Sequence, residues 1–219
     1  DNRDHRCSIH REFGEASLPS ACRQFPRVCV LEPDQVSVSL SHYCPTAAAL
    51  LFRSEASFEL VVNPKAFPGT WPFEGLDART SYPPFLRRGV LLGFDGLRAF
   101  EDSAVRTLAN DDIRLGLARI ETAIETIRHW TPAMGAVPEY VRTSFDRVSS
   151  GPETAVADPR VVLLASLAGD TPGAPRLPDF LPRNPVFSAA VDLALRRYIA
   201  SRLIAGWVVF RAEDLGSVA

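Results

Sequence analysis

The sequence of 219 residues contains no long hydrophobic run and no excess of charge of one sign. Its most apolar stretch near the C-terminus, residues 203–210, is much shorter than the roughly 20 residues that a membrane-spanning helix needs. The formal net charge of −2 gives no indication of a nucleic-acid or anionic-membrane partner. We therefore expect a cytoplasmic protein that binds neither nucleic acid nor membrane.

Motifs of several enzyme classes are also missing. The sequence has no Ser–His–Asp arrangement, no His-Glu-x-x-His motif and no phosphate-binding loop. "RVVLLASLAGDTPGAP", residues 160–175, places glycines after an apolar run, as a cofactor-binding loop would, but prolines rather than a helix follow. We interpret this segment as an ordinary helix and loop. The residues alone therefore indicate no catalytic group, and enzymatic activity stays open.

Proline-rich stretches divide the chain. Residues 63–84 contain five prolines, which is typical of a connector, and a second such stretch follows at residues 172–185. We expect a cysteine-cluster segment over residues 1–62, a connector over residues 63–84 and a helical domain over residues 85–219. The predicted fold class is mainly α, with a small irregular α+β cysteine-containing segment packed on the helical domain.

Hydrophobic periodicity predicts the individual elements. "VSVSLS", residues 36–41, alternates as a half-buried strand does, and "SFELVV", residues 57–62, has the composition of a second strand. "DDIRLGLARIETAIETIRHW" has an apolar face of isoleucine and leucine on a helix that Asp111 or Asp112 can cap. "PEYVRTSFDRV" and "PRVVLLASLAG" predict shorter helices with proline in the first turn. The last helix, about residues 186–210, should bury one apolar stripe. This stripe consists of Phe187, Val191, Leu195 and Tyr198.

Cysteine is rare but concentrated at one end of the chain. All four cysteines fall within the first 44 residues, which random placement would produce about once in 600 sequences. No Cys-x-x-Cys pair occurs, so tertiary structure must gather the sulfurs if they share a metal. Metal ligands, disulfides and inert buried thiols all remain open. The cysteines are Cys7, Cys22, Cys29 and Cys44, and three histidines that can either complete a mixed site or simply pack are His5, His10 and His42.

The surroundings of the cysteines differ. Cys44 immediately precedes a proline at the predicted start of a helix, where unpaired amides and the helix dipole stabilise a thiolate. Arg23 and Arg27 lie close to Cys22 in the sequence and can offset the negative charge of a thiolate cluster, although both also fit a solvated position. Cys29 lies in the apolar run "PRVCVLEP", where a thiol serves as a small hydrophobic side chain.

Two stretches resemble a known motif. "RCSIHREFGEASLPSACRQFPRV" followed by "VSLSHYCPTAAALL" is similar to the second half of the motif of cysteine-cluster proteins that chelate zinc or iron. That group includes the flagellin lysine-N-methylase family. Cys22 with "FPR", and "SLS" with Cys44 and its proline, match two elements of the motif, and Cys7 matches the cysteine before them. The resemblance covers about residues 3–53, and the final helix is weakly similar to the C-terminal part of such proteins.

The resemblance implies a metal site. Its ligands would be the thiolates of Cys7, Cys22 and Cys44, and its metal would be a 4Fe–4S iron–sulfur cluster or zinc. The upstream cysteine group of the family is absent, and we expect a preceding segment to supply the remaining ligands. Cys29 matches no ligand position of the family. The three matching sulfurs should therefore converge within reach of a single cluster.

The resemblance also implies a possible activity. Members of the flagellin lysine-N-methylase family transfer a methyl group from S-adenosylmethionine to a protein lysine, which would make a protein the substrate. The alternative function is a non-enzymatic helical interaction module with a structural metal site. A concave apolar surface with convergent acids would favour the enzyme, and a featureless convex bundle would favour the module.

Overall fold

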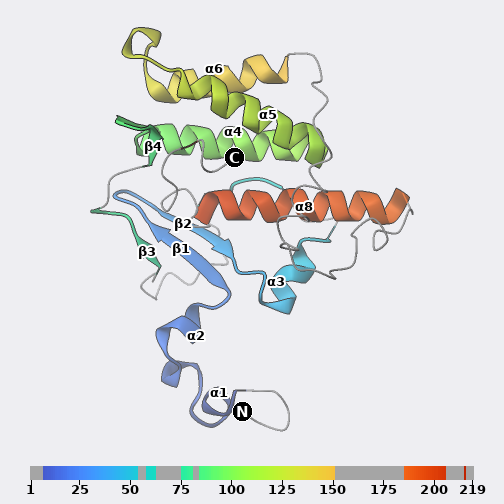
Figure 1. The fold of residues 1–219 in the computed structure, drawn as a ribbon. Coiled ribbons are helices and arrows are strands. Elements are labelled where there is room, and N and C mark those ends of the chain that lie inside the picture. The colour runs from blue at the N-terminus through green and yellow to red at the C-terminus, as the bar shows by residue number, and fades with distance from the viewer. Residues whose placement is uncertain are drawn as a thin grey trace, which may run out of the picture.

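The computed structural model describes residues 7–53, 58–62, 75–80, 84–150, 185–205 and 215, with the side chains of the last helix described from residue 189 onward. This part of the chain is mainly α with a small α+β part, as predicted (Figure 1). Within it, no helix combines the length and the hydrophobicity that crossing a bilayer requires. The helices are α1 (Ser8–Phe13), α2 (Ser20–Gln24), α3 (Pro45–Leu50), α4 (Phe94–Asn110), α5 (Ile113–Arg128), α6 (Val137–Ser149) and α8 (Pro185–Ala205), with 3₁₀ turns at Glu15–Ser17 and Pro132–Met134. The strands are β1 (Arg27–Leu31), β2 (Val36–Leu40), β3 (Leu76–Asp77), β4 (Phe85–Arg87) and β5 (Val90–Leu91).

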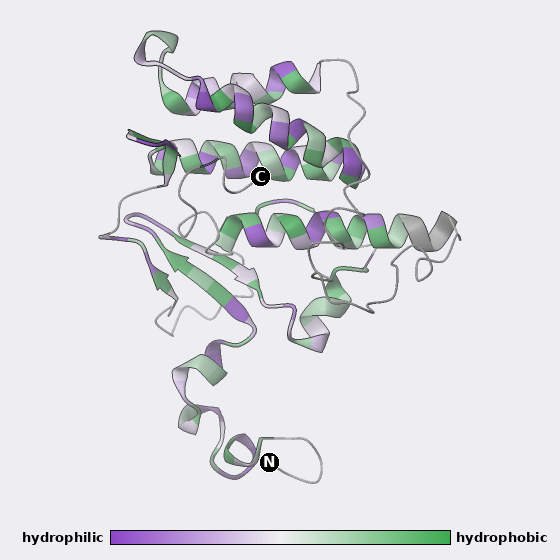
Figure 2. Ribbon diagram, viewed as in Figure 1, coloured by the Kyte–Doolittle hydropathy of each residue, from purple (hydrophilic) through white to green (hydrophobic). Residues whose placement is uncertain are grey.

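A three-stranded sheet with the order β2–β1–β3 forms the α+β part. The central strand β1 pairs antiparallel with β2, with Cys29 opposite Val38, and parallel with β3. β1 is hydrophobic apart from Arg27 (Figure 2). Gly75 precedes β3, and a Cβ atom there would lie 2.1 Å from the carbonyl oxygen of Cys29. Glycine is therefore required where β3 begins its pairing with β1.

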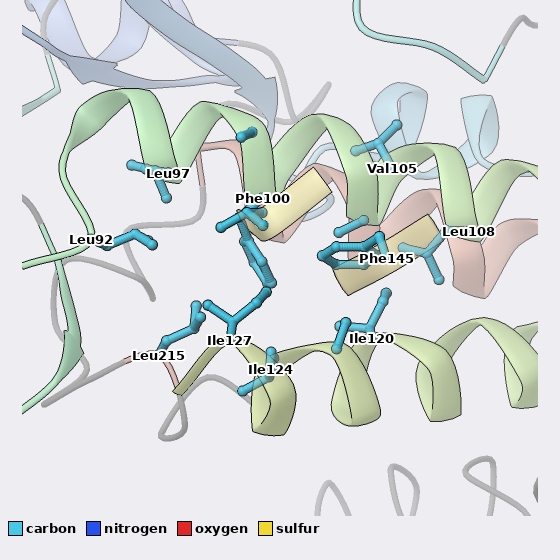
Figure 3. Packing of buried hydrophobic residues seen from close by; sticks show 14 of the residues in the cluster. Leu92, Leu97, Phe100, Val105, Leu108, Ile120, Ile124, Ile127, Phe145 and Leu215 are labelled. Carbon is cyan, nitrogen blue, oxygen red and sulfur yellow. The ribbon is translucent and has the colours of Figure 1, made fainter. Parts of the chain in front are cut away.

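The main hydrophobic core lies among the helices. α4 packs against α5, α6 and α8, and the side chains of α4 and α5 point toward one another in this core (Figure 3). Phe100 on α4 meets Phe145 on α6 edge to face, with 5.8 Å between the ring centroids. Leu97, Leu108 and Ile124 are almost fully buried in the same core. Continuous apolar packing of this kind is what stabilises helices that would be marginal alone.

Two glycines at the start of α4 have different roles. The glycines in "LLGFDGLRAF", residues 91–100, predict close helix packing at both Gly93 and Gly96. The expectation is confirmed for Gly96, where a Cβ atom would lie 2.9 Å from Cγ1 of Val137 at the start of α6. It is wrong for Gly93, where a Cβ atom would meet nothing within 4 Å. Gly93 instead adopts φ 77°, a left-handed conformation that glycine enters without strain, as the N-cap of α4.

α8 connects the helical core with the sheet. It contacts α4 and α5, and it also contacts β1 and β2 (Figure 1). In the predicted stripe, Val191, Leu195 and Tyr198 are half-buried rather than buried, while Ala194 and Ala200 are buried more deeply. The side chain of the fourth stripe residue, at position 187, and the predicted extension of the helix over residues 206–210 lie outside the described residues.

Other element predictions had mixed outcomes. The strand near residues 36–41, the helix after residue 44 and the helix over "PEYVRTSFDRV" are confirmed. Asp112 caps α5, and its carboxylate accepts hydrogen bonds from the amides of Arg114 and Leu115 at 2.9 and 3.0 Å. The strand predicted in "SFELVV" is wrong for the described residues 58–62, which form no strand. The helix predicted in "PRVVLLASLAG" lies outside the described residues.

Candidate metal centre

The four cysteines occupy four different elements. Cys7 is the N-cap of α1, Cys22 lies within α2, Cys29 lies within β1, and Cys44 is the N-cap of α3. All four are described, and none of them forms a disulfide. The cysteines are therefore not paired as disulfides in this structure. The predicted position of Cys44 at the start of a helix is confirmed.

The segment that carries Cys7 and Cys22 has no hydrophobic core. No residue from 7 to 26 is buried, and α1 and α2 extend away from the sheet and the helices (Figure 1). Phe13 is 67% exposed. Local hydrogen bonds shape the segment instead, such as those from the Gly14 amide to the His10 carbonyl at 3.1 Å and from the Cys22 amide to the Pro19 carbonyl at 2.9 Å. Tertiary packing therefore does little to fix the positions of these two thiols.

The end of β2 and α3 hold Cys44 closer to the rest of the protein. Cys44 is half-buried, and its amide donates to the carbonyl of Ser41 at 3.2 Å. At the other end of α3, Arg197 from α8 donates to the carbonyl of Leu51 at 2.9 Å and to that of Arg53. A guanidinium donor in this place satisfies carbonyls that a helix C-terminus leaves without intrahelical partners. Cys44 is thus the anchored thiol of the three predicted ligands.

Cys29 has a different environment from the other three cysteines. It is 1% exposed at the centre of the sheet. Burial raises the pKa of the Cys29 thiol, and the nearby positive charge of Arg27 lowers that pKa by less. The thiol lies 3.8 Å from the side-chain oxygen of Gln24, as a weak donor would. These features fit the predicted role of a small hydrophobic side chain.

The histidines of this region are also separated. His42 packs edge-on against Tyr198 of α8, with 5.3 Å between the ring centroids. Its Nδ1 atom is buried and makes no hydrogen bond within the described part of the chain. Burial, and then the positive charge of Arg202, lower the pKa of His42, which favours the neutral ring. His10 is exposed on α1, and His5 lies outside the described residues.

The three predicted ligands, Cys7, Cys22 and Cys44, do not form a preformed metal site. Among the described residues, which include all four cysteines, no group of three or more His, Cys, Asp or Glu side chains is placed to hold a metal ion. The sulfurs of Cys7, Cys22 and Cys44 are therefore not gathered into such a group in this arrangement of the chain, and their role as ligands stays a prediction. The sequence predicted their proximity from a motif match, but α1 and α2 have no buried contacts that would bring Cys7 and Cys22 to Cys44.

A buried group of charged side chains was not identified from the sequence. Glu32, which follows β1, is 3% exposed, and Glu101 on α4 is 5% exposed. Arg98 lies on α4 one turn before Glu101, with its Nε atom 3.8 Å from a carboxylate oxygen of Glu32. A signal was present for Glu101, because it follows Leu97 by four residues and so shares the apolar face of α4. No sequence pattern predicted the burial of Glu32, because that burial depends on where the β1–β2 turn packs against the helices.

Comparisons with known proteins leave the family open. No protein-family model matches the chain, and no match was found among characterised proteins or among solved structures. The resemblance to cysteine-cluster proteins therefore stays a prediction, as does methyl transfer from S-adenosylmethionine. Residues 160–175, which were weighed as a loop for that cofactor, lie outside the described residues.

Proposed function

We propose that residues 7–44 form a metal-binding segment, in which the thiolates of Cys7, Cys22 and Cys44 hold a zinc ion or an iron–sulfur cluster. The observation that carries this proposal is the absence of any buried residue between positions 7 and 26. A segment with two exposed thiols and no core of its own gains little from apolar burial. Metal–thiolate bonds supply folding free energy to such segments, about 10–16 kcal/mol for structural zinc.

The arrangement of the elements suggests how the site forms. Cys44 is anchored through α3 and Arg197, whereas Cys7 and Cys22 lie on short helices without buried contacts. Metal binding would therefore fold α1 and α2 toward the N-terminus of α3. Three thiolates account for three of the four ligands of a tetrahedral zinc site, or for three of the four cysteines of an iron–sulfur cluster. Cys29 stays outside the site because its sulfur is buried in the sheet.

Metal analysis of cysteine variants tests the proposal. The protein is purified anaerobically, and zinc, iron and acid-labile sulfide are measured for the wild type and for Cys22→Ala, Cys44→Ala and Cys29→Ala. We expect Cys29→Ala to keep the metal content of the wild type, and the other two variants to lose most of it. Cys22 is exposed, so its substitution leaves every core contact in place and a loss of metal there does not reflect misfolding.

Two results would overturn the proposal. Equal losses for all three variants would indicate a self-contained site that uses Cys29. A wild type that binds neither zinc nor an iron–sulfur cluster, even after reconstitution, would remove the metal function. Far-ultraviolet circular dichroism of each variant confirms that the helical domain is folded in every comparison.

A further inference from the structure

The turn between β1 and β2 docks against α4 through buried charges. The amide of Glu32 donates to the carbonyl of Gln35 at 2.9 Å, which closes the turn. The side chain of Glu32 is 1% exposed. It accepts hydrogen bonds from Ser37 Oγ at 2.7 Å and from Gln35 Nε2 at 3.1 Å. The turn therefore carries a buried negative charge to its contact with the helical core.

Arg98 is the cation of this contact, and it is shared among several acids. Its guanidinium pairs with Asp34 of the turn and, at 2.9 Å, with Asp95 of its own helix. Its Nε atom is buried 3.8 Å from Glu32 and makes no hydrogen bond to a described residue. The short ion pairs of Arg98 are thus those with the two exposed aspartates, Asp34 and Asp95. Glu32 receives only a long ion pair from it.

Glu101 is the fourth acid of the group, and its negative charge would be the one least compensated by Arg98. It lies on α4 one turn after Arg98 and is 5% exposed. Burial raises the pKa of Glu101 well above its usual range, the negative charge of Glu32 raises that pKa further, and Arg98 lowers it by less. The group therefore contains four carboxyl groups and one guanidinium.

Other elements packed against α4 bring no described charge that shifts the pKa of Glu101. α5, α6 and α8 all contact α4. On α8, Arg196 donates to carbonyls at the far end of α4, and Arg197 donates to carbonyls at the end of α3. Burial, and after it the opposing charges of Glu32 and Arg98, therefore govern the ionisation of Glu101.

We propose that the β1–β2 hairpin docks on α4 through a proton-dependent clasp, in which Glu101 is protonated while the turn is seated and alkaline pH loosens the turn. The sign follows from proton linkage. Docked Glu101 holds its proton to a higher pH than released, solvated Glu101, so docking is strongest at acidic pH. Docking weakens as the pH rises through the raised pKa of the docked glutamate and is constant above it. The clasp does not depend on metal binding.

The clasp has a structural consequence for the hairpin. β1 begins five residues after Cys22, and β2 ends four residues before Cys44. Loosening the turn at one end of the hairpin therefore acts on the element that joins these two thiols at the other end. The same pH change should affect α5 and α6 less than the hairpin, because neither helix carries a member of the charged group.

Hydrogen exchange measured at two pH values tests the clasp. Protection of peptides covering residues 27–40 is compared at about pH 5 and about pH 8, after correction for intrinsic exchange. The wild type is compared with Glu101→Gln and with the matched control Glu121→Gln, which alters an exposed glutamate on α5. We expect hairpin protection to fall about tenfold more in the wild type and in the control than in Glu101→Gln.

Two outcomes would overturn the clasp. The first is a hairpin in Glu101→Gln that loses protection with pH as the wild type does. The second is a wild-type loss that is equally large in α5 and α6, which would indicate global destabilisation. If Glu101→Gln fails to fold, Glu32→Gln serves as the second variant. It removes the charge that opposes ionisation of Glu101, so its pH dependence should be smaller than that of the wild type, and an unchanged dependence contradicts the proposal.

Discussion

Replacing Arg196 by methionine should weaken the junction between α4, α5 and α8. Arg196 Nη1 donates to the carbonyls of Leu108 at 2.9 Å and Ala109 at 3.2 Å, at the C-terminal end of α4. Its Nε atom donates to Asp192 at 2.8 Å. The other carboxylate oxygen of Asp192 accepts from the amide of Ile113 at 2.9 Å, the first residue of α5. One ion pair on α8 thus satisfies the end of one helix and the start of the next.

The size of the effect follows from burial. The side chains of Arg196 and Asp192 are 16% and 21% exposed. Breaking a fully buried pair costs about 3–5 kcal/mol, and partial exposure reduces this to about 2–4 kcal/mol. Arg106 and Asp102 form a pair of the same types at the same spacing, at 2.9 Å, but are 61% and 52% exposed. Arg106→Met should therefore cost only about 0.3–0.5 kcal/mol.

Urea unfolding followed by circular dichroism measures the difference. Both variants keep the aliphatic part of the side chain, so lost packing contributes little to either value. We expect Arg196→Met to lower the free energy of unfolding by about 2 kcal/mol more than Arg106→Met, with an unchanged m-value. A difference below about 0.5 kcal/mol would refute the argument that burial and helix-end bonding set the strength of the Arg196 pair.

Three further substitutions or reactions follow from the same structure. Gly75→Ala should destabilise the protein by about 1–3 kcal/mol and disrupt the pairing of β3 with β1, visible as faster amide exchange in residues 76–78, because the new methyl group meets a backbone carbonyl. Gly96→Ala should cost less, about 1 kcal/mol by chemical unfolding, because its neighbours are side-chain atoms of Val137 and Leu92 that can shift. Cys29 should react with an alkylating reagent at least about tenfold more slowly than Cys22 near neutral pH, since burial both shields the sulfur and raises the pKa of the thiol; equal rates by mass spectrometry would contradict its placement in the sheet.

Periodicity and capping predicted α5, α6 and α8, but they did not identify α4 as a separate helix, and they predicted the short strands poorly. α5 was predictable because Asp112 caps it and its apolar residues repeat at helical spacing. β1 was missed because it is the central strand, with Cys29 and Val30 both buried, and so it lacks the alternation of an exposed strand. Residues 58–62 have strand-forming side chains but pair with no described strand, and Val62 is 84% exposed. Strand propensity alone therefore gave a wrong prediction here, because a strand also needs a neighbouring strand with which to pair.

The candidate site was only partly readable from the sequence. The motif distinguished Cys29 from the other cysteines, and the structure places Cys29 alone in the buried sheet. The position of Cys44 at a helix N-terminus followed from the proline after it. Distances between thiols on separate short helices could not be predicted, because no periodicity fixes how unburied elements are arranged. The Glu32–Arg98–Glu101 group also depends on tertiary docking, which local patterns do not encode.

X-ray absorption at the zinc and iron edges tests the central claim most directly. The protein is purified anaerobically and loaded with zinc, or reconstituted with iron and sulfide, before measurement. If Cys7, Cys22 and Cys44 hold the metal, its neighbours include sulfur at about 2.3 Å, and Cys22→Ala reduces that sulfur shell while Cys29→Ala leaves it unchanged. A bound metal with only nitrogen and oxygen neighbours, or a protein that retains no metal, would contradict the assignment of these thiolates as ligands.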